Sequence, residues 1–100
     1  MFIVRETFVA KPGQAGKLAK LFKKVFAGVP NFRVMTDMVS SYNTVVMEMQ
    51  VESLAAFEKE MDDYNSGKAF DGMASEALEE MKSYQDMYVS GKREIFKITE

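Results

Sequence analysis

The order in which two hydrophobic periodicities follow one another limits the fold of this chain more than any other sequence feature. Alternation of apolar and polar residues indicates a strand, whereas apolar residues spaced three and four apart indicate a helix. The alternating runs cover residues 2–10, 31–39, 43–51 and 84–98, and the helical patterns cover residues 14–27, 54–64 and 68–83. The sequence therefore predicts the order β-α-β-β-α-β, with the second helical region in two pieces.

Residues that start and stop regular structure stand at the expected boundaries. Pro12 and Gly13 end the first strand, Gly28 is a suitable C-cap for the first helix, and Ser53 is a suitable N-cap for the second. Residues 40–43 hold the turn of a hairpin between the two middle strands. In the last strand, Gly91 predicts a bulge that interrupts the strand and changes which side chains share a face.

The predicted order of elements is that of the α+β ferredoxin-like fold. Right-handed crossovers place both helical regions on one face of a four-stranded antiparallel sheet, with the first and third strands in the centre. We expect the two helical regions to lie side by side on that face. One hundred residues make a single domain, residues 1–100, with a thin core that a partner would help to stabilise.

The other face of the sheet carries both apolar and polar side chains. A contiguous apolar patch of this kind indicates an interface or a ligand site. We expect a second copy to cover this face in a two-fold homodimer, and a cavity between the two sheets to hold a small organic ligand. The side chains assigned to this face are Ile3, Arg5, Thr7, Val9, Arg33, Met35, Val39, Tyr42, Thr44, Val46, Glu48 and Gln50.

Three missing residue types restrict the chemistry. The chain has no cysteine, no histidine and no tryptophan. Disulfides, zinc sites built on Cys or His, and histidine-ligated haem are therefore excluded, and no cofactor or metal is predicted. The absence of cysteine favours a cytoplasmic location. The charged N-terminal segment is neither a signal peptide nor a membrane span.

Charge is distributed unevenly along the chain. Residues 1–50 hold seven Lys or Arg against three Asp or Glu, a net of +4, and residues 51–100 hold six against twelve, a net of −6. Such asymmetry can mark a nucleic-acid or membrane surface. The charges fit the outer faces of helices, however, so we expect a basic first helix and an acidic second one, with neither nucleic acid nor membrane as a partner.

Arg5 and Glu48 are the first candidate pair for a site. Their parity places them on the same face of the two central strands, where they can meet. Glu48 can then hold an anion-binding Arg5, or act as a general base whose pKa is raised by burial. The alternative that we favour is a structural ion pair or a dimer contact. Arg33 and Asp37 are expected to form an ion pair at the rim of the sheet.

Tyrosines and methionines supply the remaining candidates. Tyr42, Tyr84 and Tyr88 can orient a ligand through their hydroxyl groups, although such aromatic residues are also enriched at interfaces. Soft methionine side chains can line an adaptable apolar pocket or fill gaps in a thin core. The methionines in question are Met35, Met38, Met47, Met49, Met61, Met73, Met81 and Met87.

Several segments together resemble the dimeric α/β-barrel superfamily, which includes antibiotic-biosynthesis monooxygenase-like domains. They are the opening FIVRETFVAKPG, the strand pair RVMTDM and TVVMEMQV, the helix start SLAAFEKEM, and Gly91 before REIFKI. The resemblance implies sheet-to-sheet dimers in which the last strand helps to lock the subunits. Haem-degrading members rely on a His and a Trp, which this chain lacks, whereas cofactor-free oxygenases use the acidity of the substrate.

The sequence thus predicts a homodimeric α/β-barrel protein that binds a small, partly apolar organic molecule between its two sheets. The candidate ligand-binding residues are Arg5, Thr7, Arg33, Tyr42, Glu48 and Tyr88. Whether the chain is an enzyme stays open at this point. The alternatives are a cofactor-independent monooxygenase acting on an electron-rich aromatic, and a dimerisation module without a ligand site.

Overall fold

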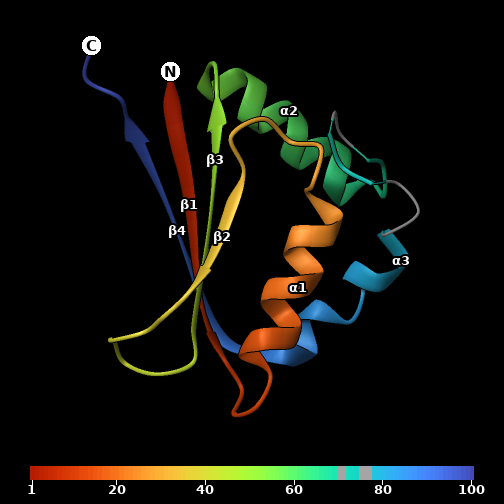
Figure 1. The fold of residues 1–100 in the computed structure, drawn as a ribbon. Coiled ribbons are helices and arrows are strands. Elements are labelled where there is room, and N and C mark those ends of the chain that lie inside the picture. The colour runs from red at the N-terminus through yellow and green to blue at the C-terminus, as the bar shows by residue number, and fades with distance from the viewer. Residues whose placement is uncertain (70–71, 75–77) are drawn as a thin grey trace.

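The computed structural model describes residues 1–69, 72–74 and 78–100, and its elements follow the predicted order (Figure 1). Two strands, β2 and β3, follow each other directly between the helical regions, as predicted. The elements are β1 (Phe2–Ala10), α1 (Ala15–Val25), β2 (Arg33–Thr36), β3 (Thr44–Val51), α2 (Leu54–Asn65), α3 (Leu78–Met81), the 3₁₀ helix η2 (Tyr84–Met87) and β4 (Tyr88–Lys97).

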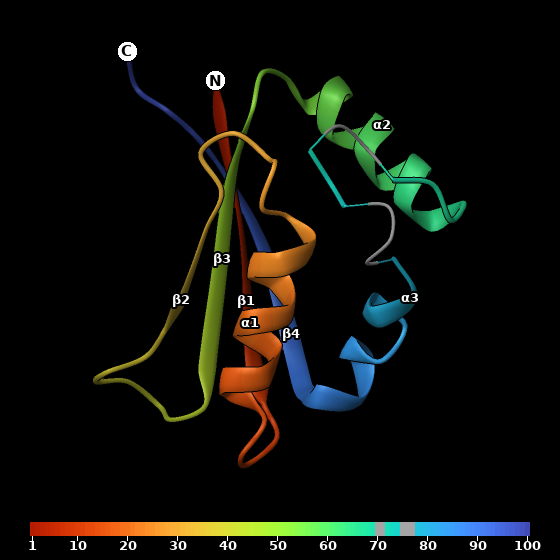
Figure 2. The same ribbon diagram turned by 45° about the vertical axis from the view of Figure 1, so that its right-hand side comes forward.

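The four strands form one antiparallel sheet in the order β2-β3-β1-β4. This confirms the prediction that the first and third strands are central and the second and last are edges. The described helices all lie on one side of the sheet, and the opposite face is bare in both orientations (Figures 1 and 2). The fold is therefore α+β and ferredoxin-like.

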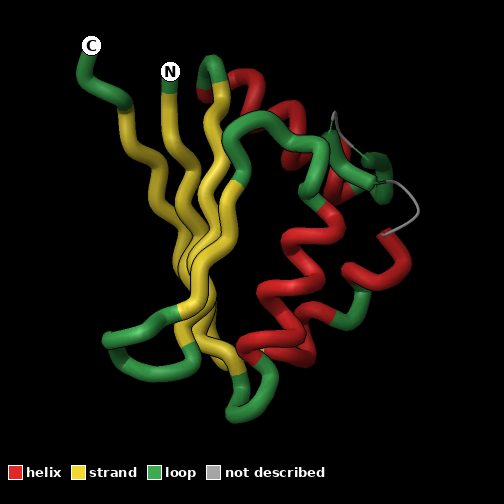
Figure 3. The backbone as a smooth tube through the Cα atoms, viewed as in Figure 1, coloured by secondary structure: helices red, strands yellow, loops and turns green. Residues whose placement is uncertain are grey.

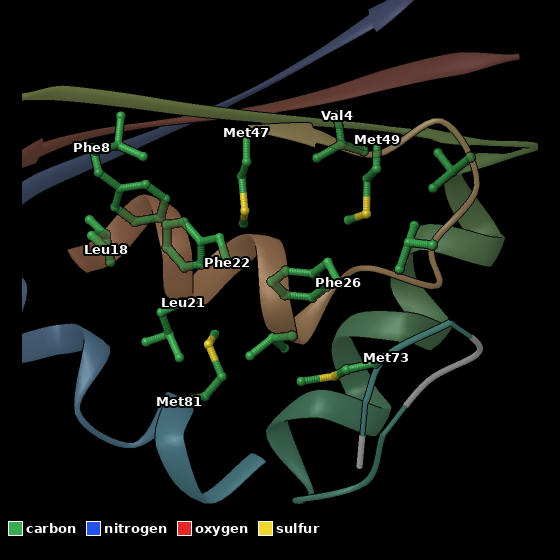
Figure 4. Close-up of a cluster of buried hydrophobic side chains, with 14 of the residues drawn as sticks. Val4, Phe8, Leu18, Leu21, Phe22, Phe26, Met47, Met49, Met73 and Met81 are labelled. Carbon is green, nitrogen blue, oxygen red and sulfur yellow. The ribbon is translucent and has the colours of Figure 1, made fainter. Parts of the chain in front are cut away.

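The core lies between the sheet and α1. This helix buries its apolar stripe, which includes Leu18, Phe22 and Val25, against side chains such as Val4 and Phe8 that point from the sheet (Figure 4). Phe22 is fully enclosed, and burial of a side chain of this size contributes about 1.5–3 kcal/mol. The helix-facing parity predicted for β1 and β3 is thereby confirmed.

The hairpin between β2 and β3 differs from the prediction, because β2 ends at Thr36 and not near residue 39. Residues 37–43 form an extended loop beyond the end of the sheet (Figure 3). The Asp37 carboxylate accepts a hydrogen bond from the backbone N–H of Thr44 at 2.8 Å. Tyr42 and Asn43 both have positive φ, so neither continues a strand.

The last strand also corrects the prediction. β4 begins at Tyr88, and the bulge lies at Val89, because Val9 pairs with Ser90 whereas Ala10 pairs with Tyr88. Gly91 is an ordinary ladder residue opposite Phe8. A Cβ atom there would lie 3.2 Å from the Phe8 ring, so glycine at this position leaves room for that ring.

The helix predicted over residues 68–83 is wrong, since only Leu78–Met81 is α-helical within the described part of that range. Gly72 has φ +89, a left-handed conformation that no helix contains, and its carbonyl accepts a hydrogen bond from the Gly28 N–H at 3.0 Å. Gly28 therefore contacts Gly72 and does not cap α1, whose cap residue is Phe26. The inward positions predicted for Phe70 and Ala77 lie outside the described residues, whereas Met73 and Met81 are buried as expected.

An ion pair joins the basic face of α1 to an acidic residue of α3. α1 lies beside α3 and η2, where Lys24 Nζ is 2.5 Å from Glu80 Oε1. Both side chains are about half exposed, so this ion pair contributes at most about 1 kcal/mol. α2 packs over the end of β3, with Ser53 accepting a hydrogen bond from the Ala56 N–H at 3.0 Å as the predicted N-cap.

Candidate functional site

A row of charged side chains crosses the bare face of the sheet. The register pairs Arg33 of β2 with Glu48 of β3, and Glu48 with Arg5 of β1. Arg5 Nε donates to Glu48 Oε2 at 2.6 Å, and Arg33 Nη2 lies 2.6 Å from Glu48 Oε1. The predicted contact between Arg5 and Glu48 is present, and Arg33 pairs with Glu48 and not, as predicted, with Asp37.

This row argues against acid–base chemistry at Glu48. Burial alone would raise the pKa of the Glu48 carboxyl, but the hydrogen bonds and positive charges of Arg5 and Arg33 outweigh it and hold that pKa below its ordinary value. The expectation that burial raises the pKa of Glu48 is therefore wrong. Glu48 is an ionised, structurally paired carboxylate that ties three strands together.

The other predicted site residues do not gather in one place. Thr7 lies on the bare face next to Arg5, opposite Val46. Tyr42 is 80% exposed in the hairpin loop. The Tyr88 ring lies in the interior, with its centroid 4.9 Å from that of Phe8 and 5.5 Å from that of Tyr84. Within one chain, the six candidate residues therefore lie in three separate places: the bare face, the hairpin loop and the interior.

A cavity lies on the other side of the sheet, between the sheet and the helices. Its volume is about 60 Å³ measured to the centres of water-sized spheres, and about 560 Å³ of free space once its open side is included. Most of its wall is apolar and soft. The apolar residues that line it are Val4, Phe8, Phe22, Phe26, Phe32, Met47, Met49, Met61 and Met81, several of which are drawn in Figure 4.

Four of the predicted pocket methionines line this cavity, namely Met47, Met49, Met61 and Met81. Met35 and Met38 are exposed elsewhere, on the bare face and in the hairpin loop, and Met73 is part of the buried core. Unbranched methionine side chains can adjust to the shape of a guest. The cavity wall is therefore suited to an apolar molecule without fixing its outline.

An ion pair reaches into this apolar space. Glu6 of β1 and Arg93 of β4 face each other in the ladder and both line the cavity. Arg93 Nε donates to Glu6 Oε1 at 3.0 Å, and Arg93 Nη2 lies 2.9 Å from the same oxygen. The Arg93 guanidinium also lies over the Phe57 ring of α2, 5.4 Å from its centroid, which keeps it in place.

Tyr64 of α2, Tyr84 of η2 and Glu48 are the other polar residues in the described lining of the cavity. The two tyrosines are close enough to influence each other's pKa. Burial, with smaller contributions from Tyr64 and Tyr88, raises the pKa of Tyr84 to about 12. Burial also raises the pKa of Tyr64, and the nearby Glu6 carboxylate raises it further. Both hydroxyls therefore stay protonated near neutral pH and offer hydrogen bonds without charge.

The cavity continues outward between the end of α2 and the segment from α3 to η2. A second, more open hollow of about 720 Å³, measured to the centres of water-sized spheres, shares Tyr64, Met81 and Tyr84 with the inner cavity. Its other lining residues include the polar side chains of Asn65, Lys82 and Gln85. These three shared residues form the boundary between the inner space and the outer hollow.

Sequence reasoning missed Glu6, Arg93 and Tyr64 as site residues. One signal was available, because Glu6 is the single charged residue on the apolar face of its strand. Arg93 could not be assigned to that face, since its orientation depends on the bulge at Val89. In the described ranges, 1–69, 72–74 and 78–100, no group of three or more acidic residues is placed to hold a metal ion. Nor does any helix there have the length and apolarity needed to span a membrane.

Comparison with known proteins identifies the fold. No protein-family model matches the chain, and no curated protein matches it. A NIPSNAP family protein from Agrobacterium tumefaciens has a TM-score of 0.76 at 10% identity, over 98% of this chain and 85% of that chain. A protein from Chloroflexus aurantiacus, described as a candidate antibiotic biosynthesis monooxygenase, has a TM-score of 0.67 at 10% identity, over 99% and 94%.

A third solved structure is similar over the whole chain. It is a candidate antibiotic biosynthesis monooxygenase from Deinococcus radiodurans, with a TM-score of 0.57 at 18% identity, over 100% of this chain and 94% of that chain. Likeness at such low identity establishes the fold alone. The fold that the sequence resemblance implied is therefore confirmed.

Proposed function

We propose that this chain forms a two-fold homodimer through the bare face of its sheet, and that each subunit binds a small, partly apolar organic molecule in the cavity between sheet and helices. One observation carries the proposal: an apolar, methionine-rich cavity into which the Glu6–Arg93 ion pair and the Tyr64 and Tyr84 hydroxyls converge. An apolar space with a few convergent polar groups is the usual form of a small-molecule site.

The homodimer is supported by apolar side chains on the bare face. Val9, Met35 and Phe96 are 39%, 37% and 45% exposed and belong to three different strands of the sheet. Phe96 also lies beneath the Arg5 guanidinium, 5.2 Å from ring centroid to Cζ, next to the charged row. A face that is both apolar and crossed by paired charges fits a self-complementary contact, because opposite charges can meet across a two-fold axis.

The ligand has two possible locations in such a dimer. The sequence predicts a chamber between two sheets, which would use Arg5, Thr7, Arg33 and Glu48, and this stays a prediction. The interior cavity is favoured because its walls exist within one chain and its polar groups already point into it. Glu48 belongs to both sets of residues, so substitutions at residues other than Glu48 can separate the two locations.

Two tryptophan substitutions test the location. Met61→Trp adds a bulky ring at the α2 wall of the cavity, and Met35→Trp adds the same ring on the bare face. We expect calorimetric titration with indole to show binding to the wild type and to Met35→Trp, but not to Met61→Trp. Loss of binding in Met35→Trp alone would place the ligand between the sheets. Failure of indole and of other small apolar probes to bind the wild type would leave a dimerisation module.

A second candidate function is turnover of the bound molecule with oxygen. It is favoured by the names of two similar structures, from Chloroflexus aurantiacus and Deinococcus radiodurans, which are described as candidate antibiotic biosynthesis monooxygenases. A cofactor-independent reaction of this kind acts on an electron-rich aromatic. Oxygen consumption with an anthrone or a quinol tests this second function. The wild type should consume oxygen faster than the Met61→Trp variant in the same mixture.

A further inference from the structure

We infer that the cavity selects uncharged molecules that donate a hydrogen bond, with Glu6 Oε2 as the acceptor, and that it discriminates against carboxylates. This inference rests on the proposed function, since it names the class of molecule that the cavity binds. It follows from the unequal use of the two Glu6 oxygens and from the unequal exposure of Glu6 and Arg93.

The two oxygens of the Glu6 carboxylate are used unequally, because the contacts with Arg93 go to one of them. Both Arg93 contacts, from Nε at 3.0 Å and from Nη2 at 2.9 Å, go to Glu6 Oε1. No described residue donates a hydrogen bond to Glu6 Oε2. A carboxylate oxygen has two lone pairs that seek donors, so a molecule in the cavity that presents an O–H or N–H group gains a charge-assisted hydrogen bond there.

In the ion pair between Glu6 and Arg93, the Glu6 side chain is the more deeply buried of the two. The Glu6 side chain is 13% exposed, whereas the Arg93 side chain is 47% exposed and its guanidinium lies over Phe57. A molecule in the cavity therefore meets the carboxylate in surroundings of low polarity, while solvent reaches the guanidinium. A second carboxylate beside Glu6 Oε2 would be repelled and would lose its own hydration.

The other polar groups of the cavity agree with a neutral guest. Burial raises the pKa of Tyr64 and of Tyr84, so both hydroxyls remain uncharged and neither supplies a positive charge for an anion. Phe8, Phe22 and Phe26 provide flat apolar surface on the remaining walls. Of the two carboxylates in the described lining, Glu48 is occupied by Arg5 and Arg33, so Glu6 Oε2 is the acceptor that remains for a guest.

Two matched pairs of probes test this inference by calorimetry. Indole and benzofuran have nearly the same shape, but only indole carries an N–H donor. Benzamide and benzoate also match in shape, but only benzoate is charged. In the wild type we expect indole to bind at least about tenfold more tightly than benzofuran, as a hydrogen bond to a charged group implies. We expect benzamide to bind and benzoate not to bind.

The substitution Glu6→Gln should weaken or reverse these ligand preferences. It keeps the side-chain shape, removes the negative charge and leaves Arg93 without its carboxylate, so the preference for indole should fall and benzoate should gain affinity. Glu94→Gln is the matched control, because Glu94 follows Arg93 in β4 but pairs with Lys92 and does not line the cavity. It should change neither preference.

The outcomes separate this inference from the proposed function. Equal binding of indole and benzofuran to the wild type, or an unchanged preference in Glu6→Gln, overturns the role of Glu6 but leaves the cavity as a ligand site. Tighter binding of benzoate than of benzamide to the wild type also overturns it. If none of the four probes binds, the proposed function fails, and the inference fails with it.

Discussion

Arg5 and Glu48 face each other across the two central strands, and Arg5 Nε lies 2.6 Å from Glu48 Oε2. Glu48 is 5% exposed, whereas the Arg5 side chain is 41% exposed. The Glu48 carboxylate is therefore the buried charge of the pair and needs positive charges to compensate it. Arg5 supplies one positive charge, and Arg33 of the edge strand β2 supplies the other. This row links β2, β3 and β1 through side chains in addition to the backbone ladder.

The contact between Arg5 and Glu48 predicts a measurable coupling. In a double-mutant cycle with Arg5→Ala and Glu48→Ala, we expect a coupling free energy of about 1 kcal/mol, because a charge-assisted hydrogen bond is weakened by the partial exposure of Arg5. Chemical denaturation of the four proteins measures it. A coupling within about 0.3 kcal/mol of zero would mean that the two side chains act independently.

The lowered pKa of Glu48 predicts how stability changes with pH. A carboxyl group whose folded pKa is depressed contributes stability that is complete above its unfolded pKa and is lost as the pH falls through its folded pKa. The wild type should therefore lose its advantage over Glu48→Gln at acidic pH, beginning near 4.5, the ordinary value for Glu. Denaturation curves of both proteins from neutral to acidic pH measure this. If the stability advantage of the wild type over Glu48→Gln grew on acidification, the lowered pKa assigned to Glu48 would be contradicted.

The approach of Gly28 to Gly72 predicts opposite effects of two alanine substitutions. A Cβ atom on Gly28 would lie 2.7 Å from the Gly72 carbonyl oxygen, so Gly28→Ala should destabilise the fold by about 1–3 kcal/mol. Gly16→Ala in α1 meets nothing within 4 Å and should stabilise it by up to about 1 kcal/mol. Thermal or chemical denaturation compares the two. A Gly28→Ala protein as stable as the wild type would show that this contact is not required.

The proposed dimer predicts that a charge in the middle of the bare face separates the subunits. Val46 lies between Thr7 and Met35 on that face, so Val46→Asp would place an unpaired carboxylate in the contact. We expect the wild type to sediment as a dimer at micromolar concentration and Val46→Asp as a monomer. Val39→Asp in the exposed hairpin loop is the control and should remain dimeric. A monomeric wild type would remove the dimer from the proposal.

Strand parity made the sheet and the Arg5–Glu48 contact predictable, because side chains two residues apart share a face whatever the rest of the chain does. The position of the bulge was not predictable in the same way. Gly91 suggested one, but the extra residue is Val89, and glycine at 91 instead makes room for the Phe8 ring. A bulge shifts every following side chain of β4, so the orientation of Arg93 could not be derived without it.

The cavity depends on tertiary arrangement in a similar way. It lies where side chains of α1, α2, α3 and η2 meet those of the sheet. Periodicity showed that Met47, Met49, Met61 and Met81 point inward, but not that they leave space between them. Glu6 was visible in the sequence as a charge on an apolar face, and its partner Arg93 became visible only in the structure.

The methyl groups of methionine provide the most direct test of the central claim, that the ligand lies between sheet and helices. In a spectrum of the protein labelled with ¹³C at the methionine methyl groups, added indole should shift the signals of Met47, Met49, Met61 and Met81. The signals of Met35 and Met38, on the bare face and in the hairpin loop, should stay in place. A shift of Met35 with the four cavity signals unchanged would contradict this account and place the ligand between the sheets.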